Sequence, residues 1–279
     1  MSKAQTLRLG SGQALERIRQ LVHAADQMAL DQYGRSPGSL KPDGSWVTPA
    51  DGAIEGFLRH ELTALFQGDM GIFGEEQGWS GNRSAAYIAL LDPIDGTAAF
   101  RSRIPVWGIS LALFRQQARA DRWEPLIGIF SMPAARHVFL GAHGKRAEWN
   151  AAPLAIPPVQ PDIRKSDYLG VSSDVQHWNL SQYPGKLRSF GVSGYEVILV
   201  ATGALQASFL TRFHFYDIAA AAMVLWQAGG GLYRLSGEPV TPTEMVCKTR
   251  DRPEVSEAPI IACHPAHLEA LLEMNFRPL

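Results

Sequence analysis

The sequence has few cysteines and no strong excess of either charge. Among 279 residues only Cys247 and Cys263 are cysteines, and their spacing is not that of metal ligands, so a disulfide framework is not predicted. The formal net charge is −1 and no block of basic residues occurs, which argues against a nucleic-acid polymer as a partner.

Long apolar runs, repeats and low-complexity tracts are also missing from the sequence. No stretch approaches the roughly 20 consecutive apolar residues that span a bilayer, and residues 1–12 hold no apolar segment of a signal peptide. We therefore expect a cytoplasmic enzyme with no membrane partner. The apolar fraction of 46% is ordinary for a globular protein, and the length suits one large domain or two lobes.

Hydrophobic periodicity predicts a pattern of elements that changes midway along the chain. Apolar residues at helical spacing predict helices over 13–32 and from 49 to about 67, and short apolar runs then predict strands over 72–73, 87–91, 107–114, 126–130 and 137–140. Four prolines between positions 153 and 161 mark the best boundary between lobes.

Beyond these prolines the predicted elements alternate. Strands are expected over 167–171, 207–210, 232–235 and 259–263, and helices over 194–202, 217–228 and 266–274. Such alternation indicates βα units and a partly parallel sheet. We therefore predict an N-terminal α+β lobe over 1–152 and a C-terminal α/β lobe over 153–279.

Two carboxylates follow the apolar run 87–91, at Asp92 and Asp95. Pro93 has no N–H to donate, so we expect the chain to leave the sheet there. The N–H groups of Gly96 and Thr97 can then face an anion. Two carboxylates this close repel each other unless a cation lies between them, and oxygen ligands favour a hard divalent ion. The segment therefore indicates a metal ion beside a phosphate.

Three further acidic positions lie at the ends of predicted elements: Asp51, Glu75–Glu76 and Asp217. Each has a structural explanation of its own, as a helix cap with Thr48, a solvated turn and a helix N-terminal residue respectively. Clefts at sheet edges nevertheless gather such ends, and phosphoryl transfer needs cations, a held water and N–H donors. The Thr97 hydroxyl is able to relay a proton from that water.

Four motifs together resemble the inositol monophosphatase family of magnesium-dependent, lithium-sensitive phosphomonoesterases. They are Asp92–Thr97, the run 215–220 followed by Ala228-Gly229-Gly230, Gly74-Glu75-Glu76, and the block from Lys41 to Asp51. The resemblance covers about residues 11 to 275. It implies a layered αβαβα arrangement of two lobes, of the inositol monophosphatase and fructose-1,6-bisphosphatase type, and a homodimer.

The resemblance also implies the roles of individual residues. Glu75, Asp92 and the Ile94 carbonyl would hold a first Mg²⁺, and Asp92, Asp95 and Asp217 a second, with Mn²⁺ as a substitute. Glu75 and Thr97 would orient the nucleophilic water. Asp51 would pair with the Thr97 hydroxyl and lie near a third metal, and the N–H groups of Gly96 and Thr97 would receive the phosphate.

Departures from the family pattern bear on the substrate, which is a small phosphorylated metabolite. Leu210 stands where inositol-specific members carry a glutamate, and the loss of that acceptor argues against inositol phosphate as the main substrate. Fructose 1,6-bisphosphate, histidinol phosphate and 3′-phosphoadenosine phosphates stay open. Ser193 and Glu196 are expected near the substrate, although Glu196 also fits a surface helix position. Ala99 replaces the usual asparagine, so the turn after Thr97 is expected to be held differently.

Two other functions are compatible with the residues. A haloacid-dehalogenase-type phosphatase would form a phospho-aspartate on Asp92, but its motif is Asp-x-Asp-Gly-Thr, one residue shorter than the spacing here. A module that binds metal or phosphate without turnover is the second alternative.

Overall fold

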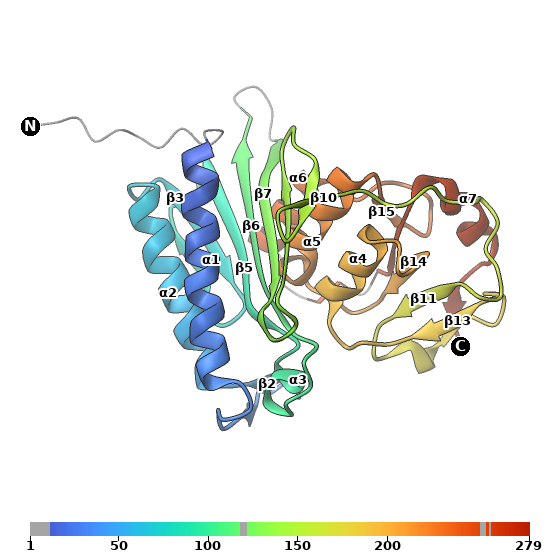
Figure 1. The fold of residues 1–279 in the computed structure, drawn as a ribbon, viewed down its shortest axis with the longest axis horizontal. Coiled ribbons are helices and arrows are strands. Elements are labelled where there is room, and N and C mark those ends of the chain that lie inside the picture. The colour runs from blue at the N-terminus through green and yellow to red at the C-terminus, as the bar shows by residue number, and fades with distance from the viewer. Residues whose placement is uncertain (1–11, 118–121, 252–254, 257) are drawn as a thin grey trace, which may run out of the picture.

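The computed structural model describes residues 12–117, 122–251, 255–256 and 258–279, arranged in five layers (Figure 1). The first layer is a helix pair, α1 (Gly12–Gln32) and α2 (Pro49–Leu65), which covers an eight-stranded sheet. A central layer contains α4 (Ser193–Ala201), α5 (Phe215–Ala228) and α6 (Pro242–Asp251). A five-stranded sheet and α7 (Pro265–Glu273) complete the stack. The predicted αβαβα layering is confirmed.

The eight-stranded sheet holds the elements nearest the predicted site. Its strands, in spatial order, are β10 (Ala152–Leu154), β9 (Ala147–Trp149), β8 (His137–Ala142), β7 (Trp123–Met132), β6 (Gly108–Gln116), β5 (Tyr87–Asp95), β3 (Met70–Gly74) and β4 (Gly78–Gly81). Only the β3–β5 pair is parallel among these neighbours, so β3 and β5 end at the same edge. That edge carries the residues that follow Gly74 and Leu91.

The five-stranded sheet is mixed, as the alternating pattern predicts. Its order is β13 (Lys186–Arg188), β11 (Tyr168–Val171), β14 (Ala207–Leu210), β16 (Ile260–Cys263) and β15 (Gly231–Arg234). Strand β11 is parallel to β13 and β14, whereas β16 is antiparallel to β14 and β15. The remaining elements are the hairpin of β1 (Ser39–Leu40) with β2 (Trp46–Val47), the two-stranded sheet of β12 (Trp178–Asn179) with β17 (Arg277–Pro278), the 3₁₀ turns Pro133–Ala135 and Val175–His177, and α3 (Thr97–Arg101).

The position of each helix follows from its apolar pattern. Helix α1 buries Ile18, Leu21 and Val22 on one face, as an amphipathic outer helix does. Helix α5 is buried on nearly every side, because it lies between the two sheets (Figure 1). The division of lobes at residue 152 stays a prediction, and its first residues, 1–11, lie outside the described residues. Pro153 itself belongs to β10, at the edge of the first sheet, where proline is tolerated.

The structure corrects one prediction, that the chain leaves the sheet at Pro93. Strand β5 continues to Asp95: Asp92 pairs with Ser110, the register then shifts, and Asp95 pairs with Gly108. The irregularity absorbs Pro93, which has no N–H for the ladder, without ending the strand. Both aspartates therefore stand on a strand that is anchored on either side of the proline.

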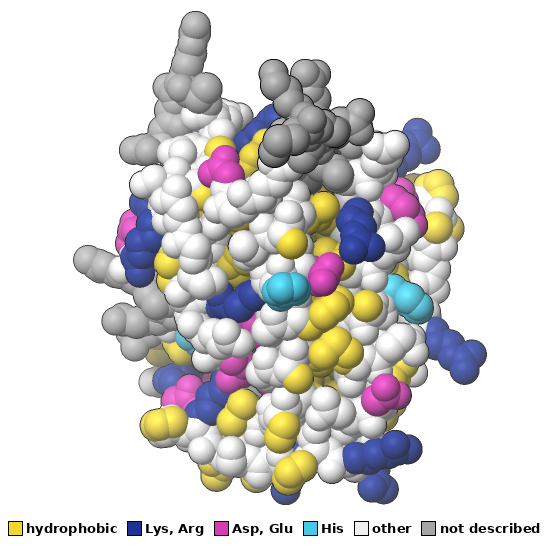
Figure 2. All heavy atoms as spheres, turned by 90° about the vertical axis from the view of Figure 1, so that its left-hand side faces the viewer, with side chains coloured by type: hydrophobic (Ala, Val, Ile, Leu, Met, Phe, Trp, Pro, Cys, Tyr) yellow, Lys and Arg dark blue, Asp and Glu magenta, His cyan; other side chains and the backbone are white. Residues whose placement is uncertain are grey.

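The outer face over α1 and α2 mixes charges of both signs. Figure 2 shows basic and acidic side chains interspersed there, and Arg17 of α1 reaches Glu61 of α2 at 3.4 Å. Within the described residues, no helix combines the length and apolar character needed to cross a membrane.

One buried carboxyl in α1 makes stability depend on pH. Asp26 is 6% exposed; its Oδ2 accepts a 2.8 Å hydrogen bond from Ser131 Oγ, and its Oδ1 has no partner among the described residues. Burial raises the pKa of Asp26 to about 7. The folded state then holds a proton that the unfolded chain releases near pH 4, so stability is greatest at low pH and is lost as pH rises toward 7.

We predict that Asp26→Asn removes this loss, because asparagine is uncharged and still accepts from Ser131. The free energy of unfolding of the wild type should fall by up to about 4 kcal/mol more than that of the variant between pH 4 and pH 8. Urea denaturation across this range measures the difference. Asp31→Asn, on the exposed side of the same helix, is the control, and parallel pH profiles for Asp26→Asn and the wild type would contradict the prediction.

Candidate functional site

Asp92 and Asp95 stand on β5 with both carboxylates directed into the structure. Asp92 is 2% exposed, and its Oδ1 accepts from the N–H of Ile94 at 2.9 Å. Asp95 is 7% exposed, and its Oδ2 accepts from the N–H of Gly194, at the start of α4, at 2.7 Å. A Cβ on Gly194 would lie 2.8 Å from that oxygen, so glycine is required for this contact between the first sheet and the central helices.

Glu75 lies beside Asp92 because β3 and β5 are parallel and in register, with Gly74 opposite Leu91. The N–H of Glu75 donates to Leu91 O at 3.2 Å, and the negative charge of Glu75 raises the pKa of the neighbouring Asp92 carboxyl. Lys41, after the first strand of the β1–β2 hairpin, places its Nζ 2.7 Å from Glu75 Oε1 and 2.7 Å from Glu76 Oε1. The sequence reasoning gave Lys41 no role, although it opens the motif that ends at Asp51.

The Glu75–Glu76 turn is held by a second residue that sequence reasoning missed. Glu55 of α2 is fully buried; its Oε2 accepts from the N–H of Glu76 at 2.8 Å, and its Oε1 accepts from the N–H of Gln77 at 3.0 Å. The same Oε1 accepts from Arg59 Nε at 2.8 Å. An (i, i+4) Glu–Arg pair beside the apolar stripe of a helix was the available signal.

Thr97 begins the short helix α3 and contacts both β5 and α2. Its Oγ1 lies 3.0 Å from Asp51 Oδ1 and 3.0 Å from the Ile94 carbonyl oxygen, so its single proton serves one acceptor at a time. Asp51 Oδ2 accepts from both the N–H and the hydroxyl of Thr48, which completes the capping box at the start of α2. The Asp51 carboxylate therefore caps α2 and also contacts the Thr97 hydroxyl.

Gly96 lies between Asp95 and Thr97 and adopts φ = 94°, in the left-handed region. A Cβ there would lie 2.6 Å from Val192 Cγ2 and 3.2 Å from the Val106 carbonyl, so no other residue fits. Ala99 lies within α3, where the N–H of Phe100 donates to Gly96 O at 3.0 Å. Backbone hydrogen bonds hold this turn in place of the side chain that the family usually has.

Asp217 reaches the same region from α5. Its Oδ2 accepts from the N–H of His214 at 2.9 Å in a capping arrangement. Ser110, opposite Asp92 in the sheet, donates its hydroxyl to Tyr216 O at 3.1 Å and so ties β6 to the start of α5. The predicted acidic residues are thus brought to one edge by a parallel strand pair and a helix N-terminus.

These carboxylates repel one another in a poorly hydrated setting. Burial raises the pKa of Asp92 well above its ordinary value, and the negative charges of Glu75, Asp95 and Asp217 raise it further. Burial likewise raises the pKa of Asp95 to about 7 and that of Asp217 well above its usual range, with Asp95 adding to the latter. Lys41 is the nearby cation: burial alone would lower its pKa, but Glu75 and Glu76 raise it.

The donor set fits a hard divalent cation. Its atoms are carboxylate oxygens and the Ile94 carbonyl, which suit Mg²⁺, and the acids outnumber the one lysine beside them. Within the described ranges, no three His, Cys, Asp or Glu side chains already form a ligand set around one point. Asp92, Asp95 and Asp217 each accept a hydrogen bond from a backbone N–H group, and Glu75 accepts one from Lys41.

Comparison with known proteins decides the relationship. A sequence model described as "Inositol monophosphatase family" matches residues 5–267. The chain belongs to this family. It is a phosphomonoesterase with the family's mixed α/β fold.

This family member is similar to proteins with different named activities. A histidinol-phosphatase of Streptomyces coelicolor is 27% identical over 236 residues, which cover 78% of this chain and 85% of that protein. An IMPase of Thermotoga maritima superposes with a TM-score of 0.78 at 18% identity, over 94% of this chain and 96% of the other. An IMPase/NADP phosphatase complexed with Mg²⁺ and phosphate gives 0.77 at 20% identity, over 94% of each chain. At such identities the two structures show the fold alone.

The protein has a cavity of about 260 Å³ beside the acidic edge, the sheet edge that carries Glu75, Asp92 and Asp95. Ser193 and Glu196 line it together with Ser172, Asp174 and Arg212. Glu196 is 1% exposed, so it is not a surface helix residue; its oxygens accept from the N–H of Phe190 at 3.1 Å and from Ser208 Oγ at 3.2 Å. Leu210 is fully buried in the core and offers no acceptor.

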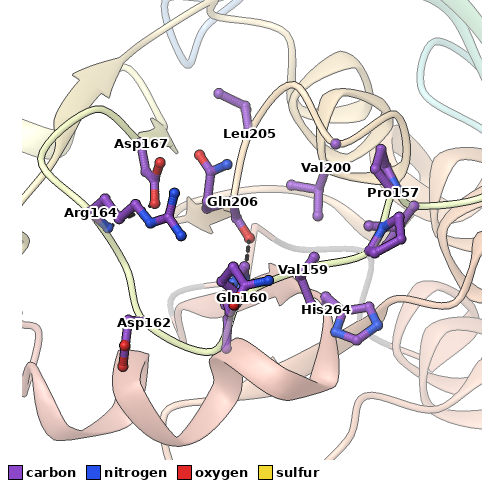
Figure 3. A pocket seen from close by; sticks show the side chains of 14 residues that line it. Pro157, Val159, Gln160, Asp162, Arg164, Asp167, Val200, Leu205, Gln206 and His264 are labelled. Atoms are coloured by element: carbon purple, nitrogen blue, oxygen red, sulfur yellow. Dashed lines mark hydrogen bonds between the residues drawn. The ribbon is translucent and has the colours of Figure 1, made fainter.

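A second cavity, of about 240 Å³, lies elsewhere in the molecule (Figure 3). Its wall includes Pro157, Val200, Gln206 and His264, and it contains none of the predicted site residues. Of these two cavities, the one lined by Ser193 and Arg212 therefore contains predicted site residues, Ser193 and Glu196.

We predict that Glu55→Ala destabilises the fold and impairs the site. The change leaves Arg59 buried without its carboxylate, at a cost of about 3–5 kcal/mol in the free energy of unfolding, measurable by urea denaturation. It also removes the acceptor that holds the N–H groups of Glu76 and Gln77.

The double variant Glu55→Met, Arg59→Met separates the two effects. Replacing both charges with apolar side chains should restore much of the stability, whereas phosphatase activity should stay low because the turn has lost its acceptor. Full activity in the double variant would show that Glu55 does not position Glu75.

Proposed function

We propose that this chain hydrolyses a small phosphorylated metabolite by direct attack of water in a Mg²⁺-dependent reaction. The observation that carries the proposal is the convergence of Glu75, Asp92, Asp95 and Asp217 beside the N–H groups of Gly96 and Thr97. Acids with pKa values raised by burial and mutual repulsion lower their free energy by binding a cation.

The residues divide into two overlapping ligand sets. Glu75, Asp92 and the Ile94 carbonyl would hold one Mg²⁺, and Asp92, Asp95 and Asp217 would hold another, with Mn²⁺ as a substitute. Bound there, the ions would neutralise phosphate oxygens and make a water more acidic. Asp51 lies behind Thr97 and is the candidate ligand for a third ion.

Thr97 and Glu75 orient the attacking water in this proposal. The Thr97 hydroxyl donates to Asp51 Oδ1 or to the Ile94 carbonyl, so the lone pairs on Thr97 Oγ1 are free to accept a hydrogen bond from the water. The Asp51 carboxylate accepts a hydrogen bond from the Thr97 hydroxyl and so fixes the rotamer of that hydroxyl. The N–H groups of Gly96 and Thr97 bind the phosphate oxygens at a residue where φ = 94° leaves the backbone unobstructed.

The leaving alcohol occupies the cavity lined by Ser193 and Glu196. Leu210 gives that alcohol no acceptor, which disfavours inositol phosphate as the main substrate. Similar proteins are named as a histidinol-phosphatase, an IMPase and an IMPase/NADP phosphatase, so several classes of phosphomonoester are candidate substrates. We further propose a cytoplasmic homodimer that Li⁺ inhibits.

We predict that the purified protein releases phosphate from at least one member of a panel of phosphomonoesters. The panel contains inositol phosphate, histidinol phosphate, fructose 1,6-bisphosphate and nucleotide 3′-phosphates, and release should occur with Mg²⁺ and stop when a chelator removes it.

Asp92→Asn should lower kcat/KM by about a thousand-fold or more, since it deletes the charge shared by both ligand sets. The free energy of unfolding of Asp92→Asn should equal or exceed that of the wild type, because the variant lacks a negative charge that the neighbouring carboxylates repel.

Asp69→Asn, an exposed position after α2, is the matched control and should leave both quantities unchanged. Retained turnover in Asp92→Asn would contradict the ligand assignment. A phospho-aspartate trapped on Asp92 would contradict direct attack of water, and no release from any substrate would contradict the enzymatic proposal.

A further inference from the structure

Arg212 has an unusual backbone conformation at the edge of the candidate active site. It follows β14 on the way into α5 and adopts φ = 49°, in the left-handed region, although it is not glycine. Such a conformation is uncommon for a long side chain and persists where neighbouring contacts impose it. Arg212 is also part of the wall of the cavity lined by Ser193 and Glu196.

Contacts on both sides hold the Thr211–Arg212 turn. The N–H of Thr211 donates to Ser172 Oγ at 3.0 Å, and Thr211 Oγ1 donates to Asp174 Oδ1. Ser172 and Asp174 follow β11, which is parallel to β14. The carboxyl ends of adjacent parallel strands are where open α/β sheets bind ligands. Arg212 is thus presented on a braced turn and not on a free loop.

The cavity borders the segment where the phosphate is expected, because Val192 of its wall lies against Gly96. A Cβ placed on Gly96 would lie 2.6 Å from Val192 Cγ2. Ser193, also in the wall, precedes Gly194, whose N–H donates to Asp95. An alcohol esterified to a phosphate at Gly96 and Thr97 therefore extends into the cavity, whose volume of about 260 Å³ accommodates a sugar-sized group.

The charges in the cavity leave Arg212 available. Within the described part of the chain, its guanidinium makes no ion pair or hydrogen bond, including with Asp174 and Glu196 of the same wall. Asp174 is engaged by the Thr211 hydroxyl. Burial raises the pKa of Glu196 to about 8, so this carboxyl is mostly neutral at pH 7 and repels an anion little.

We propose that Arg212 determines specificity by binding a second anionic group, a carboxylate or a phosphate, on the leaving alcohol. The preferred substrates are then phosphomonoesters whose alcohol carries another negative charge. A guanidinium matches the planar or tetrahedral oxygens of both groups through paired N–H donors. This inference rests on the proposed function, because it concerns the alcohol released by the same site.

The test uses four 6-phosphates with the same six-carbon chain, one of gluconate and three of glucitol, that differ only at carbon 1. Carbon 1 is the carboxylate carbon in 6-phosphogluconate, and it bears a hydroxyl in glucitol 6-phosphate, a phosphate in glucitol 1,6-bisphosphate and an ammonium in 1-amino-1-deoxyglucitol 6-phosphate. Initial rates of phosphate release give kcat and KM for the wild type and for Arg212→Gln, Arg212→Gly and Arg212→Lys. The two anionic arms distinguish carboxylate from phosphate recognition.

We expect the wild type to favour at least one anionic substrate over glucitol 6-phosphate by about ten-fold or more in kcat/KM. Arg212→Gln and Arg212→Gly should abolish this preference, because KM rises for the anionic substrates more than for the hydroxyl substrate. Arg212→Lys should keep part of the preference, because it retains the charge but not the paired donors.

Arg212→Gly separates binding from backbone geometry. Glycine adopts φ = 49° without strain, so a purely structural role predicts that this variant behaves as the wild type or better, which would overturn the inference. A preference for the ammonium substrate would also overturn the inference, because it would indicate recognition by the Asp174 carboxylate in place of Arg212. If the wild type cleaves other phosphomonoesters but none of these four, the inference fails and the proposed function stands; if it cleaves no phosphomonoester, both fail.

Discussion

Repulsion among carboxylates at the end of β3 and β5 is the constraint on which the rest of the site depends. Asp92 and Asp95 are almost completely buried; burial is the largest cause of their raised pKa values, and the negative charge of Glu75 raises both further. A cluster of this kind is costly for a fold to keep unless its charges are compensated. The compensation visible in the protein is one lysine and a series of backbone N–H groups, which is less than the acids require and leaves the cluster suited to divalent cations.

The architecture keeps that cluster together against its own repulsion. The parallel pairing of β3 with β5 sets Glu75 beside Asp92, and the Gly194 N–H links Asp95 to the central helix layer. Ser110 links the sheet to the start of α5 and so locates Asp217. In the turn after β3, Glu55 accepts from the backbone N–H groups of Glu76 and Gln77, and Lys41 donates to the carboxylates of Glu75 and Glu76. The candidate ligands thus come from elements whose relative positions are fixed by hydrogen bonds across layers, not from one loop.

Local patterns in the sequence were sufficient for some of these features. The capping arrangement of Asp51 with Thr48 is confirmed, whereas the metal and phosphate site that Asp92–Thr97 indicates stays a prediction. The continuation of β5 past Pro93 was not predictable, because it depends on a register shift against β6 that only the paired strand reveals. Glu55, Lys41 and Arg212 were missed for a similar reason: their importance lies in contacts with residues about 20 to 40 positions away, or in a backbone angle. The short strand β10 was hidden by Pro153, which only an edge strand accepts.

Calorimetric titration of Mg²⁺ into the wild type and into Asp92→Asn, without substrate, tests the central claim most directly. If the carboxylates at the end of β5 form the cation site, the wild type binds Mg²⁺ and the variant, with the shared charge removed, loses that binding while remaining folded. Superimposable isotherms for the two proteins, or no binding to the wild type at millimolar Mg²⁺, would contradict the claim that this acidic edge exists to hold divalent cations.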